Sequence, residues 1–169
     1  MKGQISFVEY LTALTIFITS VLFIAFQLIS FIPQYLNQVN DERVRIDAYQ
    51  ISELLANDPG NPINWYASGP VFRIGLSSES ANKTNFLSLQ KINALNSYCS
   101  APNGYDNVKG NMSATSNFAI LLFNRTAGSG KILINCQPTY PFSSPINATL
   151  RRIVAIDSND IGELIVQTG

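Results

Sequence analysis

Two cysteines, Cys99 and Cys136, are the side chains of this 169-residue chain that could form a disulfide. A disulfide between them would stabilise the fold by roughly 4 kcal/mol in the chain-entropy model, because it would close a long loop. The alternative is a pair of buried thiols, since free cysteine packs well in protein cores. Disulfides persist outside the cytosol, so the first interpretation suits an extracellular domain.

Asparagines in the motif Asn-X-Ser/Thr are the second group that could undergo chemistry, because this motif accepts N-linked glycans. The chain is rich in Asn, Ser and Thr, so chance alone accounts for some of these motifs. They become informative only if the segment that carries them lies outside the cell. The four candidate glycosylation sites are Asn82, Asn111, Asn124 and Asn147.

Motifs for catalysis or metal binding are missing from these residues. The chain has no histidine, which excludes His-based triads and His-ligated metal sites within it. The run Ala127-Gly128-Ser129-Gly130-Lys131 lacks the spacing of a phosphate-binding loop, and we interpret it as a turn. An acidic cluster near the C-terminus fits no EF-hand spacing and is also interpreted as a turn. Its members are Asp157, Asn159, Asp160 and Glu163.

Glu9 is the one acid at the start of a long apolar run, because the next charged residue is Asp41. A carboxylate inside a membrane helix costs about 2.5 to 3.5 kcal/mol at the bilayer centre and less near the interface, so such residues tend to have partners. In the alternative interpretation, Glu9 lies close enough to the start of the helix to reach the lipid headgroups.

The apolar run itself, from about Phe7 to Ile32, is longer than the roughly 20 residues that span a bilayer. A secretory signal has a shorter apolar region and a cleavage site of small residues after it, whereas bulky residues follow this run. Lys2 is the only cation before the run, which favours a cytoplasmic N-terminus. We therefore expect a single membrane span with the rest of the chain outside the cell.

The start of the chain, Lys2-Gly3-Gln4-Ile5-Ser6 followed by an acid and an apolar helix, resembles the class III signal peptide of archaeal type IV pilin-like proteins. The resemblance implies that a membrane prepilin peptidase cuts between Gly3 and Gln4 and removes residues 1–3. It also implies that Glu9 meets the new N-terminal amine of a neighbouring subunit in a filament. Glu9 is the sixth residue after this cut, whereas the pilin acid is usually the fifth.

Helical periodicity continues beyond the span and ends at Asn57, before a segment rich in Pro, Gly and Asn. Residues 4–57 are thus expected to form one long helix, with Pro33 as a kink or as the exit from the bilayer. Its upper half, residues 34–57, is amphipathic. The apolar stripe of this half is Val44, Ala48, Ile51 and Leu55.

Residues 58–169 are expected to form one β-rich head. Short strand-like runs lie between turn signals, and the turns 127–130 and 157–162 predict two antiparallel hairpins. Only residues 88–96 read as a helix, with Ser88 as its N-cap. The predicted fold class is α+β, with a long N-terminal helix followed by an antiparallel β-rich head. The predicted strands are 71–76, 118–123, 131–135, 150–156 and 163–167.

These patterns, with the resemblance, predict a structural subunit of an archaeal cell-surface filament and no enzyme or cofactor. The expected partners are copies of the chain, the membrane before assembly, the prepilin peptidase and a pilus assembly platform. A net charge of zero, from 11 basic and 11 acidic residues, predicts no nucleic-acid partner, and we expect no small-molecule substrate. The alternatives are a membrane-anchored binding or adaptor protein that does not polymerise and, less favoured, an anchored enzyme with a carboxylate-based site.

Overall fold

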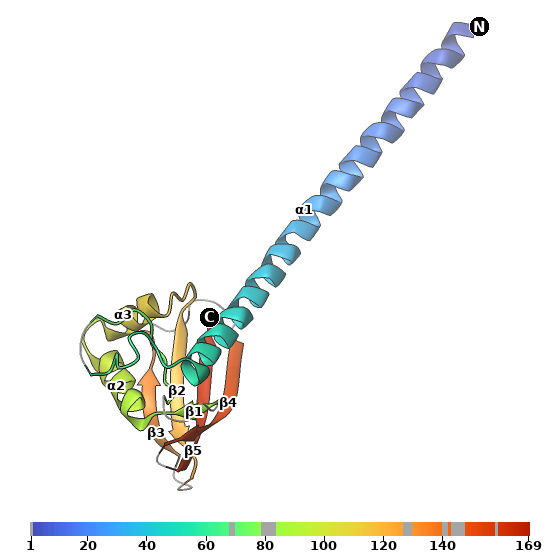
Figure 1. Ribbon diagram of the computed structural model, residues 1–169. Helices are drawn as coiled ribbons and strands as arrows, with labels where there is room; N and C mark the ends of the chain where they lie inside the picture. The colour runs from blue at the N-terminus through green and yellow to red at the C-terminus, as the bar shows by residue number, and fades with distance from the viewer. Residues whose placement is uncertain are drawn as a thin grey trace. The chain divides into compact units, whose positions relative to one another are not determined.

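The computed structural model describes residues 2–67, 70–78, 84–126, 130–139, 142, 148–157 and 159–169, with the backbone alone for residues 2–6 (Figure 1). The chain divides into two compact units, Met1–Asn40 and Asp41–Gly169. The first helix, α1 (Lys2–Asn57), contributes to both units. The boundary between the units falls where the uncharged apolar run ends and charged residues begin.

The first unit consists of the N-terminal part of α1. This helix is long and apolar enough to cross a membrane, as its sequence predicts. Pro33 lies inside the helix and does not end it. One proline removes a single backbone hydrogen bond, which a long helix tolerates at a local cost.

The second unit begins with the amphipathic end of α1. All four apolar residues predicted to form its buried stripe are buried, with exposed fractions of 9% for Val44, 2% for Ala48, 5% for Ile51 and 0% for Leu55. The periodicity of the sequence therefore identified the face of α1 that packs into the core of this unit.

A mixed five-stranded sheet forms the other side of that core, with the strand order β1-β4-β5-β2-β3. The pairs β2–β3, β2–β5 and β4–β5 are antiparallel, and the short β1 runs parallel to β4. The antiparallel pairing expected of both hairpins is confirmed, although residues 127–129 and Ser158 of their turns lie outside the described residues, and the fold is α+β as expected. The strands are β1 (Phe86–Leu87), β2 (Phe118–Asn124), β3 (Lys131–Cys136), β4 (Ala148–Ile156) and β5 (Asp160–Thr168).

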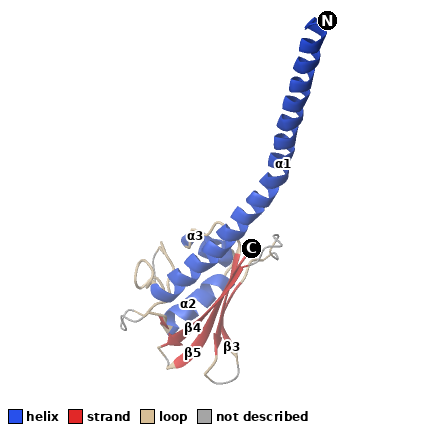
Figure 2. Cartoon of the chain, turned by 90° about the vertical axis from the view of Figure 1, so that its right-hand side faces the viewer, coloured by secondary structure: helices blue, strands red, loops and turns tan. Residues whose placement is uncertain are grey.

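Two further helices, α2 (Leu89–Ser100) and α3 (Gly104–Asn111), join the end of α1 on one side of the sheet (Figure 2). α2 contains the predicted helix 88–96, whereas α3 was not predicted. The sheet face beneath the helices carries alternate residues of the central strands, as the period of two requires. Fully buried examples are Phe118, Ile120, Leu122, Leu164 and Val166.

Residues 71–76 do not form the strand that their sequence predicts. Their backbone pairs with the end of α1 and the turn after it: the N–H of Leu76 donates to the carbonyl of Leu55 at 3.0 Å, and the N–H of Asn61 donates to the carbonyl of Arg73 at 2.9 Å. These hydrogen bonds occupy groups that a strand ladder would use. The segment therefore packs as an irregular strap against α1.

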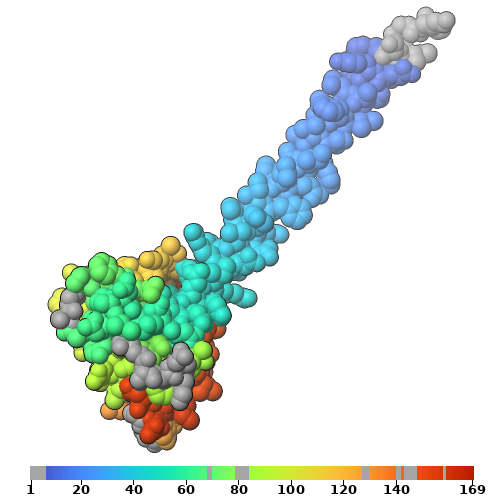
Figure 3. Space-filling view, in the orientation of Figure 1, coloured from blue at the N-terminus to red at the C-terminus, as the bar shows by residue number. Residues whose placement is uncertain are grey.

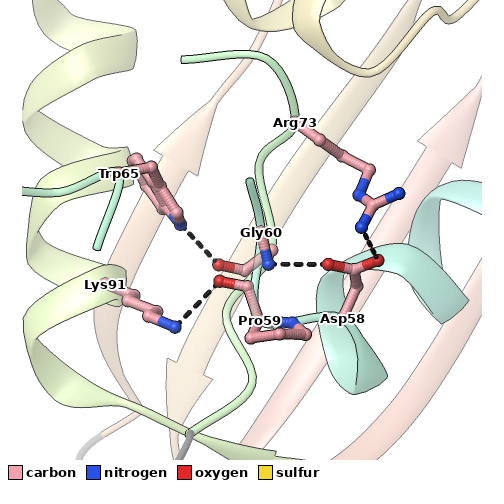
Figure 4. A network of polar contacts seen from close by, with 7 residues as sticks. Asp58, Pro59, Gly60, Trp65, Arg73 and Lys91 are labelled. Atoms are coloured by element: carbon pink, nitrogen blue, oxygen red, sulfur yellow. Dashed lines mark hydrogen bonds and ion pairs between the residues drawn. The ribbon is translucent and has the colours of Figure 1, made fainter. Parts of the chain in front are cut away.

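A polar network holds this strap and the turn after α1 to α2 (Figure 4). The Lys91 ammonium, on α2, donates to the carbonyls of Pro59 at 2.8 Å and Ser77 at 3.0 Å. The indole N–H of Trp65 donates to the carbonyl of Gly75 at 2.9 Å. Because Gly75 and Ser77 are buried and Pro59 is partly buried, the side chains supply hydrogen-bond partners that these carbonyls would otherwise lack.

Candidate functional site

The most unusual surface of the described chain is the N-terminal part of α1, drawn in blue in Figure 3. Its large apolar side chains from Phe7 to Val39 are all exposed, from 41% for Leu14 to 72% for Phe26. A contiguous apolar surface of this extent is rare on a soluble monomer and indicates an interaction with lipid or protein.

The serine and threonine hydroxyls within this apolar segment are hydrogen-bonded to the helix backbone. The hydroxyls of Thr12, Thr15, Thr19, Ser20 and Ser30 each donate to a carbonyl one turn back along α1, at 2.7 to 3.0 Å. A hydroxyl bonded in this way needs no water. The segment can therefore enter an apolar environment without leaving these hydroxyls unpaired.

Glu9 lies in the same segment and is exposed. Its backbone carbonyl accepts a hydrogen bond from the Thr12 hydroxyl at 2.9 Å, and no described residue pairs with its carboxylate. The structure thus supplies no internal partner for this acid among the described residues. Gly3 and Gln4 belong to the first turns of α1, and their side chains lie outside the described part.

Cys99 and Cys136 form a disulfide that joins α2 to β3, with their Cα atoms 5.4 Å apart. The disulfide interpretation is therefore confirmed over the pair of free thiols. Next to it, the Asn96 side-chain carbonyl accepts the N–H of Asn135 at 3.1 Å. The disulfide and this hydrogen bond together hold α2 against the edge strand of the sheet.

Of the four candidate glycosylation sites, Asn111 ends α3 and Asn124 ends β2. Asn82 and Asn147 lie outside the described residues.

The acidic turn before β5 does not form a metal site in the described part of the chain, where no group of three or more His, Cys, Asp or Glu residues could hold an ion. Asp157 accepts the N–H of Leu89 at 2.9 Å and so caps α2. Glu163 pairs with Arg125 and, at 3.6 Å, with Arg151. Sequence analysis missed both roles because each joins residues far apart in the chain.

A shallow groove of about 450 Å³ lies beside the end of α1, lined by Tyr49, Glu53, Asp58 and Arg73 among others. Its charged groups are paired: Glu53 with Arg152 at 2.6 Å and Asp58 with Arg73 at 3.0 Å. Hydrogen bonds from Asn57 and then from Arg152 lower the pKa of Glu53. The groove's acids are thus engaged in structural pairs, which leaves the apolar segment of α1 as the candidate functional surface.

Comparison with protein-family models gave no match, and comparisons with curated proteins and with solved structures also gave none.

Proposed function

We propose that this chain is a pilin-like structural subunit of an archaeal type IV-type cell-surface filament. The apolar segment of α1 first anchors the subunit in the membrane and later packs against the same segment of other copies. In this proposal the second unit lies outside the cell, and the function is assembly, with no reaction catalysed by the subunit.

The observation that carries the proposal is the exposed apolar surface from Phe7 to Val39. Burial of apolar surface is favourable by roughly 25 cal/mol per Å², so a segment of this kind is driven into lipid or against similar helices. The internally bonded hydroxyls of Thr12 and Thr15 suit either environment. The Glu9 carboxylate, which has no partner in the described part of the chain, gives the segment one group that can bind a specific partner.

Processing completes the proposal. The resemblance at Lys2-Gly3-Gln4 predicts a cut that keeps α1 from Gln4 onward and creates a positive amine at Gln4. In a low-dielectric filament core, such an amine attracts a carboxylate far more strongly than it does in water. The amine of one copy and the Glu9 carboxylate of the next would then neutralise each other and fix the axial register.

The decisive experiment determines the N-terminus of the surface protein by mass spectrometry and images the filaments that the cells shed. We expect wild-type protein to begin at Gln4 and to be the main component of a filament. Replacing Gly3 by Trp should block the cut and abolish assembly, whereas Lys2→Arg keeps the basic leader and serves as the control. Uncut protein present only as single molecules, in cells that carry filaments, would contradict the proposal and favour the non-polymerising anchor.

A further inference from the structure

The two described glycosylation motifs differ sharply in local structure. Asn124 is the last residue of β2, and Arg125 and Thr126 after it are exposed. The side-chain carbonyl of Asn124 accepts the N–H of Thr126 at 2.9 Å, which makes the motif a compact Asx-turn at the end of a strand. The motif is therefore held in one defined conformation, with Asn124 half-buried and the two residues after it exposed.

The two donors that sugar transfer uses, the Asn124 amide nitrogen and the Thr126 hydroxyl proton, have no hydrogen-bond acceptor among the described residues. The hydrogen bond that forms the turn uses the Asn124 oxygen Oδ1. No described residue accepts a hydrogen bond from the Asn124 amide nitrogen Nδ2. The Thr126 hydroxyl oxygen accepts the N–H of Ile161 at 2.5 Å, which leaves its own O–H proton available as a donor. An enzyme could thus engage both the acceptor amide and the hydroxyl that defines the motif without breaking these bonds.

Asn111 presents the opposite case. It is the last residue of α3, and Met112 after it is only 8% exposed. The N–H of Met112 donates to the carbonyl of Val108 at 3.0 Å, and Ser113 has a left-handed backbone with φ of 52°. To present its three residues to an enzyme, this motif would have to unwind the helix end and pull Met112 out of the core, whereas the turn at Asn124 keeps its conformation.

We propose that Asn124 is an N-glycosylation site of the folded chain and that Asn111 is not. The donor is a polyprenyl-phosphate-linked sugar. The Nδ2 nitrogen of Asn124 attacks the anomeric carbon of the sugar, the bond from that carbon to the phosphate oxygen breaks, and the lipid phosphate leaves with the electron pair. Nδ2 loses one proton to a base of the transferase, so charge and atoms balance. The product keeps Oδ1 and can keep its hydrogen bond to Thr126.

This inference rests on the proposed function in one respect, which is that the second unit lies on the side of the membrane where sugar transfer occurs. The choice between Asn124 and Asn111 comes from their local structures alone. The two parts therefore fail in different ways, and one set of measurements separates them.

The test is glycopeptide mass spectrometry on the full chain, produced in an archaeal host that N-glycosylates its own surface proteins. We expect a sugar mass on the peptide with Asn124 and the bare mass on the peptide with Asn111. Asn124→Gln and Thr126→Val should abolish the modified species, whereas Thr126→Ser and Asn111→Gln should retain it. An intact Cys99–Cys136 disulfide in each variant shows that the loss is not caused by misfolding.

Two results would overturn the inference and leave the proposed function standing. One is a bare Asn124 in molecules that carry a sugar at Asn82, Asn111 or Asn147, and the other is a bare chain whose N-terminus is Gln4 and which forms filaments. A sugar on Asn111 as well as on Asn124 would overturn the exclusion of Asn111, since it would show that transfer precedes folding. A bare chain with an uncut N-terminus and its second unit in the cytoplasm would overturn the inference together with the proposed function.

Discussion

Glu9 is the residue on which the assembly proposal makes its sharpest prediction. Its carboxylate has no partner among the described residues. In the membrane, no ion pair or hydrogen bond from these residues would offset the free energy needed to desolvate it. Replacing Glu9 by Ala should leave membrane insertion unchanged or improved and should lower the yield of filaments several-fold. The measurement is the ratio of sheared filament protein to membrane-bound protein.

The matched control for this prediction is Glu42→Ala, because Glu42 is an exposed acid of the same helix beyond the apolar segment. The control should not change the ratio. A normal yield with Glu9→Ala would return Glu9 to the simpler role of an acid that reaches the lipid headgroups.

Gly75 shows why residues 71–76 form an irregular strap rather than a strand. A Cβ added there would lie 2.1 Å from the carbonyl oxygen of Asp58, which belongs to rigid backbone. We predict that Gly75→Ala lowers the free energy of unfolding by about 2 kcal/mol or more, because the backbone must move to relieve the overlap. Chemical denaturation of the detergent-solubilised chain measures this change.

Gly110 provides the comparison for Gly75. It lies inside α3, and an added Cβ would meet nothing within 4 Å. Gly110→Ala should therefore stabilise the chain by roughly 0.5 to 1 kcal/mol, since alanine loses less backbone entropy in a helix. If both substitutions had the same effect, the close approach at Gly75 would be disproved.

Glu53 gives the fold a predictable dependence on pH. Hydrogen bonds from Asn57 and Arg152 lower its pKa below the ordinary value of 4.5. The unfolded chain therefore takes up this proton first as the pH falls, so the stabilisation from Glu53 is complete above pH 4.5 and is lost as the pH drops through the lowered pKa.

The expected outcome is that Glu53→Gln makes unfolding less sensitive to acid. The difference between the free energies of unfolding at pH 7 and pH 3 should be smaller for the variant than for the wild type, since the amide does not titrate and still accepts hydrogen bonds. An equal difference in both proteins would mean that the pairs of Glu53 with Asn57 and Arg152 contribute nothing to stability.

Among the elements, α2 is capped by a side chain that does not belong to its N-cap residue. Ser88 occupies the N-cap position that its sequence predicts, yet its side chain forms no capping hydrogen bond. The carboxylate of Asp157 accepts the N–H of Leu89 instead. Asp157→Ala should cost about 1 kcal/mol of stability, whereas Ser88→Ala should cost less than about 0.5 kcal/mol.

Thermal unfolding of the two variants measures this contrast. A larger loss of stability with Ser88→Ala than with Asp157→Ala would show that Ser88 caps α2 and would refute capping by Asp157. Asp157 directly follows β4, so its hydrogen bond to Leu89 joins the β4–β5 hairpin to α2. The loss of stability in Asp157→Ala therefore also measures the contribution of this contact.

The elements that sequence analysis predicted correctly are those fixed by local pattern. The stripe from Val44 to Leu55 has helical spacing, and the two hairpins have turn residues between strand-like runs.

The elements that sequence analysis missed depend on distant partners. α3 has few buried residues to set a period, and β1 is two residues long and exists through its pairing with Ala155 and Ile156. The strap was misread because Val71 to Leu76 has strand residue types, although Gly75 within it signals a close backbone approach.

At the scale of the whole molecule, the candidate site could be found from the sequence because it consists of one continuous segment. The apolar run and Glu9 are neighbours in the chain, so no fold is needed to bring them together. What the structure adds is that no described residue is a partner for the Glu9 carboxylate. The local structure of the glycosylation motifs could not be inferred in this way, because the helix end at Asn111 and the Asx-turn at Asn124 both match the pattern Asn-X-Ser/Thr.

The division of the chain into two units predicts that the second can be produced without the first. The exposed apolar side chains from Phe7 to Val39 belong to the first unit, while Ala48, Ile51 and Leu55 lie in the core of the second. A fragment of residues 41–169 should therefore be folded and monomeric without detergent, as size-exclusion chromatography and circular dichroism would show.

A fragment of residues 58–169 is the matched control, because it removes the end of α1 and leaves the rest of the second unit. Burial of one Leu or Ile side chain is worth roughly 1.5 to 3 kcal/mol, and domains have only about 5 to 15 kcal/mol of net stability. Loss of Ile51 and Leu55 together with the hydrogen bond from Thr168 to the Val44 carbonyl should therefore unfold or aggregate this shorter fragment. Equal stability of the two fragments would show that α1 serves only as an anchor, whereas aggregation of 41–169 would show that the second unit needs the first for solubility.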